Sequence, residues 1–102
     1  MLANKCYHLW DFIRDRLDDP TVSFVVWINK TDEEFRIANT GEFSNAWGFL
    51  KNSTKMTYDK VSRSLRYYCS LGILEKVCGT RLQFRFGKQR AWTKIGDNTV
   101  GL

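Results

Sequence analysis

The sequence is poor in the residues that most catalytic and metal sites require. Its 102 residues include a single histidine, His8, and three cysteines. No Ser/His/Asp, Cys/His or paired-carboxylate arrangement is recognisable, so the groups needed for general acid–base or nucleophilic catalysis are missing. No apolar run approaches the roughly 18 residues of a membrane-spanning helix. We therefore expect neither an enzyme nor a membrane-spanning protein.

The three cysteines, Cys6, Cys69 and Cys78, cannot all pair within one chain. No Cys-x-x-Cys spacing occurs, and a zinc site would require all three thiols and His8 to converge on one ion. The N-terminus does not have the pattern of a secretory signal peptide, and unpaired thiols are typical of a reducing compartment. The sequence thus predicts a chain without a metal ion or another cofactor.

Acidic residues are scarce in the second half of the chain. Residues 1–50 carry five Lys/Arg against eight Asp/Glu, whereas residues 51–102 carry eleven against three, so the net charge changes from −3 to +8. A basic half-chain favours a polyanionic partner such as nucleic acid. An anionic membrane surface, an acidic protein and ordinary solubilising charge are alternatives that charge alone leaves open.

Apolar residues recur at helical spacing in three stretches. These stretches are residues 8–17, 40–50 and 56–69. Asn39 or Thr40 is the expected N-cap of the second helix, and Thr57 is that of the third. Gly72 suits the left-handed position that closes a helix. Only the short polar turn 51–55 separates the second helix from the third, which is the arrangement of a helix-turn-helix.

Four further stretches have the pattern of strands. They are residues 21–29, 34–38, 73–77 and 81–86. The apolar run 25–28 indicates that the first strand is central or well covered. In the last strand, Leu82, Phe84 and Phe86 alternate with polar residues and are expected on one face. The order of elements predicts an α+β winged helix-turn-helix, with three helices packed on a small four-stranded antiparallel sheet.

Aromatic residues make up 15% of the chain and are expected to build much of one core. We assign to it Trp10, Phe12, Trp27, Phe84 and Phe86, and mainly also Tyr58 and Tyr68. Residues 8–87 are predicted to form the domain, 1–7 a lead-in, and 88–102 a weakly patterned tail packed through Trp92 and Ile95.

The helix 56–69 separates its residues onto two faces. One face holds apolar residues such as Val61 and Leu65 and is predicted to pack in the core. The opposite face carries Arg63 and Tyr67, with Arg66 at its edge, one turn from Arg63. Because a helix fits the major groove and Arg contacts the O6/N7 edge of guanine bidentately, we predict a DNA recognition helix. A merely solvated surface is the alternative.

Several segments match, in order, the motifs of a known family. Residues 56–69 have the sequence Met-Thr-Tyr-Asp-Lys-Val-Ser-Arg-Ser-Leu-Arg-Tyr-Tyr-Cys, where the family has Met-Asn-Tyr-Asp-Lys-Leu-Ser-Arg-Ala-Leu-Arg-Tyr-Tyr-Tyr. Upstream, residues 9–12 resemble its Leu-Trp-x-Phe, Trp27 resembles the tryptophan of its first strand, and residues 47–52 contain its Trp-Gly-x-x-Lys-Asn. The hairpin 73–86 is similar to its wing. The chain therefore resembles the ETS domain, a winged-helix domain of transcription factors, over residues 8 to 87.

The chain also departs from the family pattern, mainly in the turn 50–54. Leu50 stands where the family usually has Arg, and Ser-Thr at 53–54 replaces a frequent Lys-Pro. Cys69 replaces a common Tyr, and Ala46 a usual Leu. We expect a divergent member, similar to the epithelium-specific branch in Met-Thr-Tyr at 56–58, whose affinity and flanking-base preference are altered.

The resemblance implies sequence-specific binding to double-stranded DNA with a GGA core, in the nucleus and with room for protein co-regulators. Arg63 and Arg66 would each fork onto a guanine, and Tyr67 would reach a base edge or a phosphate. The expected phosphate contacts are the backbone N–H of Leu9, the indole of Trp47, and the side chains of Lys51, Lys55, Lys60, Lys76 and Arg81. A protein-interaction module and a non-specific nucleic-acid binder are the alternatives. No membrane or small-molecule substrate is expected as a partner.

Overall fold

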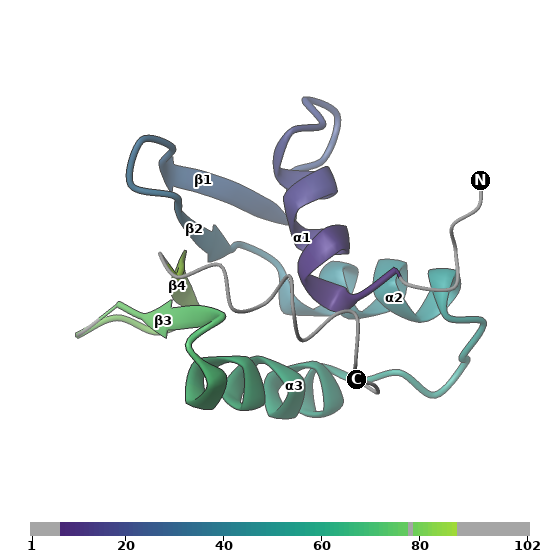
Figure 1. The fold of residues 1–102 in the computed structure, drawn as a ribbon. Coiled ribbons are helices and arrows are strands. Elements are labelled where there is room, and N and C mark those ends of the chain that lie inside the picture. The colour runs from purple at the N-terminus through teal and green to yellow at the C-terminus, as the bar shows by residue number, and fades with distance from the viewer. Residues whose placement is uncertain (1–6, 78, 88–102) are drawn as a thin grey trace.

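The structure, a computed structural model, describes residues 7–77 and 79–87 (Figure 1). Its helices are α1 (Leu9–Leu17), α2 (Thr40–Leu50) and α3 (Tyr58–Leu71). Its strands are β1 (Val25–Asn29), β2 (Glu34–Ile37), β3 (Leu74–Lys76) and β4 (Gln83–Phe86). The strands form one antiparallel sheet in the order β1-β2-β4-β3. The predicted winged helix-turn-helix is confirmed, whereas Trp92 and Ile95 of the predicted tail lie outside the described residues.

Side chains beside the helices fix where the second and third begin. The Asn39 Oδ1 accepts a hydrogen bond from the Glu42 N–H at 2.9 Å, and the Thr57 Oγ1 accepts one from the Lys60 N–H at 3.4 Å. Each bond satisfies one of the free N–H groups in a first helical turn. At the other end of α3, Gly72 has a φ of 80°, which a side chain would disfavour. Asn39, Thr57 and Gly72 thus have the predicted capping roles.

The first strand lies at an edge of the sheet, so the prediction of a central or well-covered strand was wrong. Within the described residues, β1 pairs with β2 alone, and Ile28 near its end is exposed. The strand also begins at Val25, later than expected. Before it, the Asp19 Oδ1 accepts hydrogen bonds from both the N–H and the hydroxyl of Thr21, which holds that segment in a turn. An apolar run without alternation does not distinguish a central strand from an edge strand.

One core joins the helices to the sheet. Phe12 of α1 has its ring centroid 5.4 Å from that of Phe43 and 5.2 Å from that of Trp47, both on α2. Trp27 is only partly buried: it packs against the core, with its ring centroid 6.3 Å from that of Phe86, and its indole N–H donates to the Asp18 Oδ1 at 3.3 Å. Of the other predicted core aromatics, Tyr58 is partly buried and the rest are buried, namely Trp10, Phe12, Phe84, Phe86 and Tyr68.

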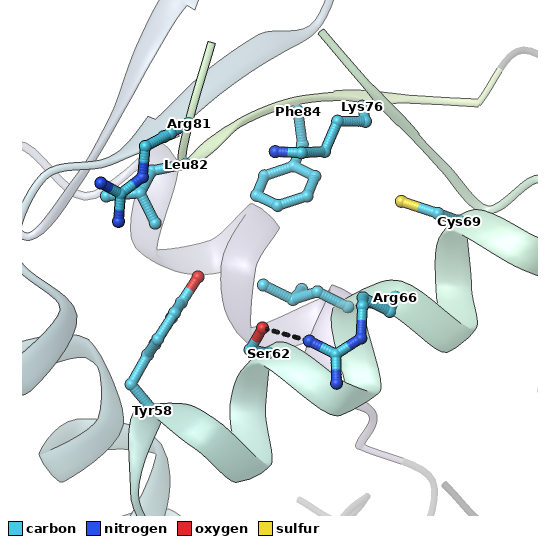
Figure 2. A pocket seen from close by; sticks show the side chains of 9 residues that line it. Tyr58, Ser62, Arg66, Cys69, Lys76, Arg81, Leu82 and Phe84 are labelled. Carbon is cyan, nitrogen blue, oxygen red and sulfur yellow. Dashed lines mark hydrogen bonds between the residues drawn. The ribbon is translucent and has the colours of Figure 1, made fainter. Parts of the chain in front are cut away.

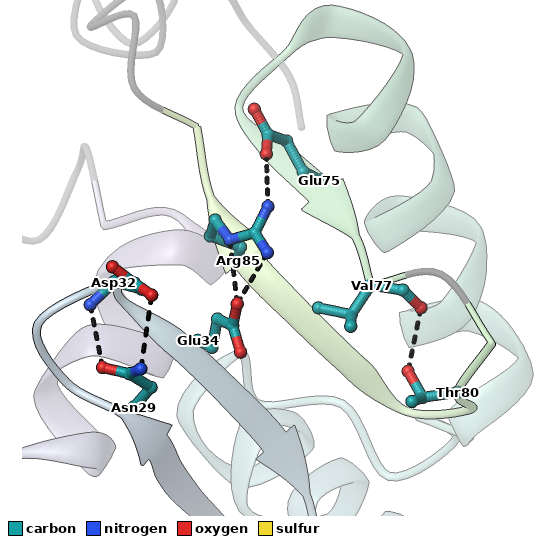
Figure 3. A network of polar contacts seen from close by, with 7 residues as sticks. All are labelled: Asn29, Asp32, Glu34, Glu75, Val77, Thr80 and Arg85. Atoms are coloured by element: carbon teal, nitrogen blue, oxygen red, sulfur yellow. Dashed lines mark hydrogen bonds and ion pairs between the residues drawn. The ribbon is translucent and has the colours of Figure 1, made fainter.

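Arg85 ties β4 to both of its neighbouring strands (Figure 3). Its guanidinium donates two hydrogen bonds to Glu34 on β2, at 2.6 and 3.1 Å, and one to Glu75 on β3 at 3.0 Å. These hydrogen bonds, first those with Glu34, raise the pKa of Arg85, so its charge is constant at every relevant pH. The interaction fixes the wing, which we define as residues 74–86, against the rest of the sheet.

The turn between α2 and α3 packs closely on the end of α2. The Gly48 carbonyl accepts a hydrogen bond from the Ser53 N–H at 2.8 Å. A Cβ added at Gly48 would lie 2.7 Å from the Met56 Cβ and 2.9 Å from the Ser53 carbonyl oxygen. Because one of these neighbours is backbone, the turn would have to move to admit a side chain. Gly48 therefore sets how closely the two helices of the helix-turn-helix approach.

Gly48→Ala is expected to destabilise the domain by about 1–2 kcal/mol, since overpacking costs roughly 1–3 kcal/mol and the helical preference of Ala offsets part of it. Gly41→Ala, in the first turn of the same helix, is the matched control. Its new Cβ would meet only the Asn39 Oδ1, at an ordinary 3.6 Å. We expect this control to be neutral or slightly stabilising. Urea unfolding of both variants measures the difference, and equal midpoints would contradict the close approach at Gly48.

Candidate nucleic-acid interface

The helix α3 presents one face to the core and the other outward. Val61, Leu65 and Tyr68 are buried, whereas Arg63 and Arg66 are exposed. The predicted division of the helix is thus confirmed. Because the buried side chains recur at three- and four-residue spacing, they hold the helix along its whole length and leave the opposite stripe free for a partner.

Both outward arginines are held by a residue one turn earlier on the same helix. The Arg63 guanidinium lies 3.6 Å from the Asp59 carboxylate, and its side chain is 73% exposed. The Arg66 Nη1 donates to the Ser62 hydroxyl at 2.9 Å (Figure 2). Exposed contacts of this kind are worth only a few tenths of a kcal/mol. Both guanidinium groups can therefore be released to a stronger acceptor, and Arg63 and Arg66 stand one turn apart.

Tyr67 and Lys60 complete the outward stripe of α3. Tyr67 is 47% exposed, so about half of its side chain is accessible to a partner. The Lys60 ammonium donates to the backbone carbonyl of Lys55 at 3.1 Å, which bridges the first turn of α3 to the preceding loop. The N-terminal part of the helix and the loop before it therefore present positive charge together.

The turn before α3 supplies two further exposed lysines. Lys51 and Lys55 are both exposed, and the Lys51 ammonium lies 5.3 Å from the ring centroid of Trp47, within cation–π range. Trp47 itself is buried against the core, in contact with Phe12. Its side chain thus packs in the core, and the phosphate contact of its indole N–H stays a prediction.

The wing carries two more of the predicted phosphate contacts. The Lys76 ammonium donates to the Thr80 carbonyl at 3.3 Å and lies 5.3 Å from the centre of the Phe84 ring. Arg81 is exposed on the turn between β3 and β4. Figure 2 shows both side chains above α3, on the opposite side of a hollow from Arg66. The fold thus brings together cations that lie ten or more residues apart in the chain.

The start of α1 lies close to a tyrosine of α3. The Leu9 side chain is buried, as expected, and the phenol of Tyr68 from α3 reaches the same turn. Burial raises the pKa of Tyr68, and hydrogen bonds with the backbone of Trp10 and Leu9 oppose this by less. The phenol oxygen of Tyr68 therefore lies near the first turn of α1.

Two residues near the arginines were not singled out from the sequence for this site. Ser62 holds Arg66, and its position four residues earlier on the helix was the available signal. Tyr58 is half-buried rather than fully in the core, and its hydroxyl points toward the wing (Figure 2). Burial raises the pKa of Tyr58, with an opposing effect of Arg81, so the phenol is neutral and able to donate. Neither the wing contact nor this exposure follows from helical periodicity.

Across residues 7–77 and 79–87, no group of three or more His, Cys, Asp or Glu side chains is placed to hold a metal ion. Cys69 is a free thiol, and burial raises its pKa despite the opposing charge of Lys76. In the same part of the chain no helix is both long and apolar enough to cross a membrane. The chemistry available at this surface is therefore that of cationic and hydrogen-bonding groups.

Comparison with known proteins gives the family. The Ets-domain model matches residues 6–87. The ETS homologous factor of Homo sapiens is 42% identical over 88 residues, which are 83% of this chain and 29% of that protein. The ETS-related transcription factor Elf-3 of Homo sapiens is 39% identical over 94 residues, 90% of this chain and 25% of that protein, so the chain spans less than a third of these relatives. It belongs to the Ets-domain family, the winged-helix domains through which ETS transcription factors bind specific DNA sequences.

Proposed function

We propose that this chain acts as the DNA-binding part of a nuclear transcription factor and binds double-stranded DNA with a GGA core. The observation that carries the proposal is the pair Arg63 and Arg66, exposed one turn apart on the outward face of a helix whose inner face is anchored in the core. Two adjacent guanines present two O6/N7 edges in the major groove, and each suits one guanidinium fork. Tyr67 directly follows Arg66 in the sequence and would contact a base edge or a phosphate.

The surrounding cations support this orientation of the helix. Lys51 and Lys55 are exposed just before α3, and Lys76 and Arg81 of the wing lie across the hollow from Arg66 (Figure 2). Phosphate contacts on both sides of a recognition helix fix its register in the groove. Further proposed phosphate contacts are the Lys60 ammonium, the Leu9 backbone N–H and the Trp47 indole N–H. No enzymatic activity is part of this proposal.

A salt titration with two duplexes tests the proposal. One duplex contains a GGA core and the other has the same composition in scrambled order. We expect both affinities to fall steeply with salt, because each neutralised phosphate contributes about 0.9 to the slope of log K against log salt concentration. We also expect the GGA duplex to bind at least about 10³-fold more tightly than the scrambled one. Equal binding of the two duplexes would rule out specific recognition.

One observation favours a second candidate, a protein-interaction module. At the end of α2, Phe49 is 86% exposed and Leu50 is 48% exposed. Adjacent exposed apolar side chains of this size mark contact surfaces more often than single ones do. If the chain bound both duplexes equally and weakly, this surface rather than α3 would be the functional one.

Leu50→Arg is expected to strengthen DNA binding. Leu50 is exposed next to Lys51, at the position where the family resemblance leads us to expect Arg. One added phosphate contact should steepen the salt slope by about 0.9 and raise affinity for both duplexes alike. Leu50→Gln, which adds polarity without charge, is the control and should leave the slope unchanged. Fluorescence anisotropy at several salt concentrations measures the slopes, and an unchanged slope for Leu50→Arg would place this residue away from the DNA.

A further inference from the structure

A hollow of about 550 Å³ lies between α3 and the wing (Figure 2). We name it the α3–wing cavity. Its floor is apolar, formed by Leu65 of α3 and by Leu82 and Phe84 of the wing. Arg66, Lys76 and Arg81 also line it, so three cations surround a hydrophobic floor. The volume is within the range of sites that hold small organic ligands.

Unlike Arg63 and Arg85, these three cations have no acidic partner in the described part of the chain. Arg63 pairs with Asp59, and Arg85 donates to Glu34 and Glu75. Within residues 7–77 and 79–87, no carboxylate oxygen lies within 4.0 Å of the charged nitrogens of Arg66, Lys76 or Arg81; the six ion pairs found there involve other cations. Positive charge gathers at the cavity without compensation. Its electrostatic complement is an anion.

The three cations around the apolar floor form what we call the rim of the cavity. Floor and rim together specify the chemistry of the anion further. A DNA phosphate would satisfy the cations but would leave the apolar floor uncovered. A ligand with an apolar chain and one carboxylate would cover the floor and compensate the rim together. Burial raises the pKa of the Cys69 thiol, which also lines the cavity, so this group is neutral and does not repel a carboxylate.

We propose that the α3–wing cavity binds a small amphipathic carboxylate of the fatty-acid type, with its acyl chain on the apolar floor and its head group among the three cations. Arg66 is shared between this cavity and the proposed guanine contact. The ligand and DNA therefore exclude each other, and this consequence rests on the proposed function. By linkage, each weakens the binding of the other by the same factor.

The direct test uses octanoate as the probe and 1-octanol as its uncharged counterpart, added to the full chain without DNA. We expect octanoate to shift the backbone amide signals of Ser62, Cys69 and Leu82 in a ¹H–¹⁵N spectrum, and to bind at least about tenfold more tightly than octanol. Equal binding of the two probes, or shifts confined to other parts of the domain, would overturn the proposal.

Variants test separately the contribution of the rim cations and that of the cavity volume to octanoate binding. Lys76→Gln and Arg81→Gln should each weaken octanoate binding roughly threefold, as expected for partly exposed charge pairs. Lys30→Gln, on the β1–β2 turn and outside the cavity, is the matched control and should have no effect. Cys69→Tyr should fill the cavity and weaken binding by about tenfold or more, whereas Cys69→Ser should preserve it. Unchanged octanoate binding in a folded Cys69→Tyr variant would place the ligand elsewhere.

A competition experiment between octanoate and DNA separates this inference from the proposed function. Octanoate at saturation should raise the apparent Kd for the GGA duplex in the parent chain but not in Cys69→Tyr. If octanoate binds the cavity and the chain does not distinguish the two duplexes, the proposed function fails and the cavity stands. If octanoate does not bind while GGA recognition is intact, the cavity proposal alone fails.

Discussion

Arg63→Lys is expected to weaken binding to a GGA duplex by roughly 5- to 150-fold, the equivalent of one lost bidentate contact worth about 1–3 kcal/mol. Binding to the scrambled duplex should fall less than about threefold. Lysine keeps the positive charge but replaces the planar fork of donors by a single ammonium group, so it still attracts phosphates while it no longer matches O6 and N7 together. Competition of the two duplexes in one anisotropy assay measures the ratio directly.

The structure indicates that this substitution leaves the fold intact. The Arg63 side chain is 73% exposed, and its contact with Asp59 at 3.6 Å joins two exposed groups on one helix. Such a pair contributes only about 0.3–0.5 kcal/mol, and lysine keeps most of it. A thermal unfolding midpoint within about 2 °C of the parent would show that any loss of affinity arises at the interface.

Arg81→Lys is the matched control for Arg63→Lys, because the wing residue is proposed to contact a phosphate rather than a base. A lysine replaces arginine well as a point charge against a phosphate. Arg81→Lys should therefore change binding to both duplexes by the same small factor. If Arg63→Lys also changed both affinities equally, Arg63 would contact the DNA backbone and its assignment as a guanine reader would be wrong.

The fold was predictable because local patterns agree along the chain. The inner face of α3 followed from the spacing of Val61, Leu65 and Tyr68, and its start from Thr57 as a cap. The family resemblance then supplied the roles of Arg63 and Arg66, which no periodicity contains. Where a pattern was ambiguous the prediction failed, as with the apolar run around Ile28, since such a run is compatible with central and edge strands.

The α3–wing cavity was not predictable, because it depends on contacts between distant segments. Leu65 and Leu82 line one hollow although 17 residues separate them in the chain. Leu82 also has a backbone φ of 65°, which is unusual for a residue with a branched side chain. Because the residue is not a glycine, the sequence does not signal this conformation. The absence of a carboxylate beside Arg66 and Lys76 in the described part of the chain likewise follows from where Glu34 and Glu75 lie, since both acids bind Arg85.

Phe12→Ala is expected to cost about 3–5 kcal/mol of unfolding free energy, the usual loss for a buried phenylalanine. The Phe12 side chain is 0% exposed and contacts Phe43 edge to face, with Trp47 beside it, so its removal leaves a cavity between α1 and α2. A domain of about 80 residues has roughly 4–12 kcal/mol in total. The unfolding midpoint should therefore fall by more than about 12 °C, as measured by calorimetry.

Phe49→Ala makes the same chemical change at an 86% exposed ring and should alter stability by less than about 0.5 kcal/mol. A comparable loss in both variants would mean that Phe49 is covered in solution.

The comparison also separates effects on stability from effects on DNA recognition. Phe12 packs on Trp47, next to the turn that carries Lys51, so a destabilised but still folded Phe12→Ala protein should lose affinity for both duplexes in the same proportion. Only substitutions on the outward face of α3, such as Arg63→Lys, should change the ratio between them.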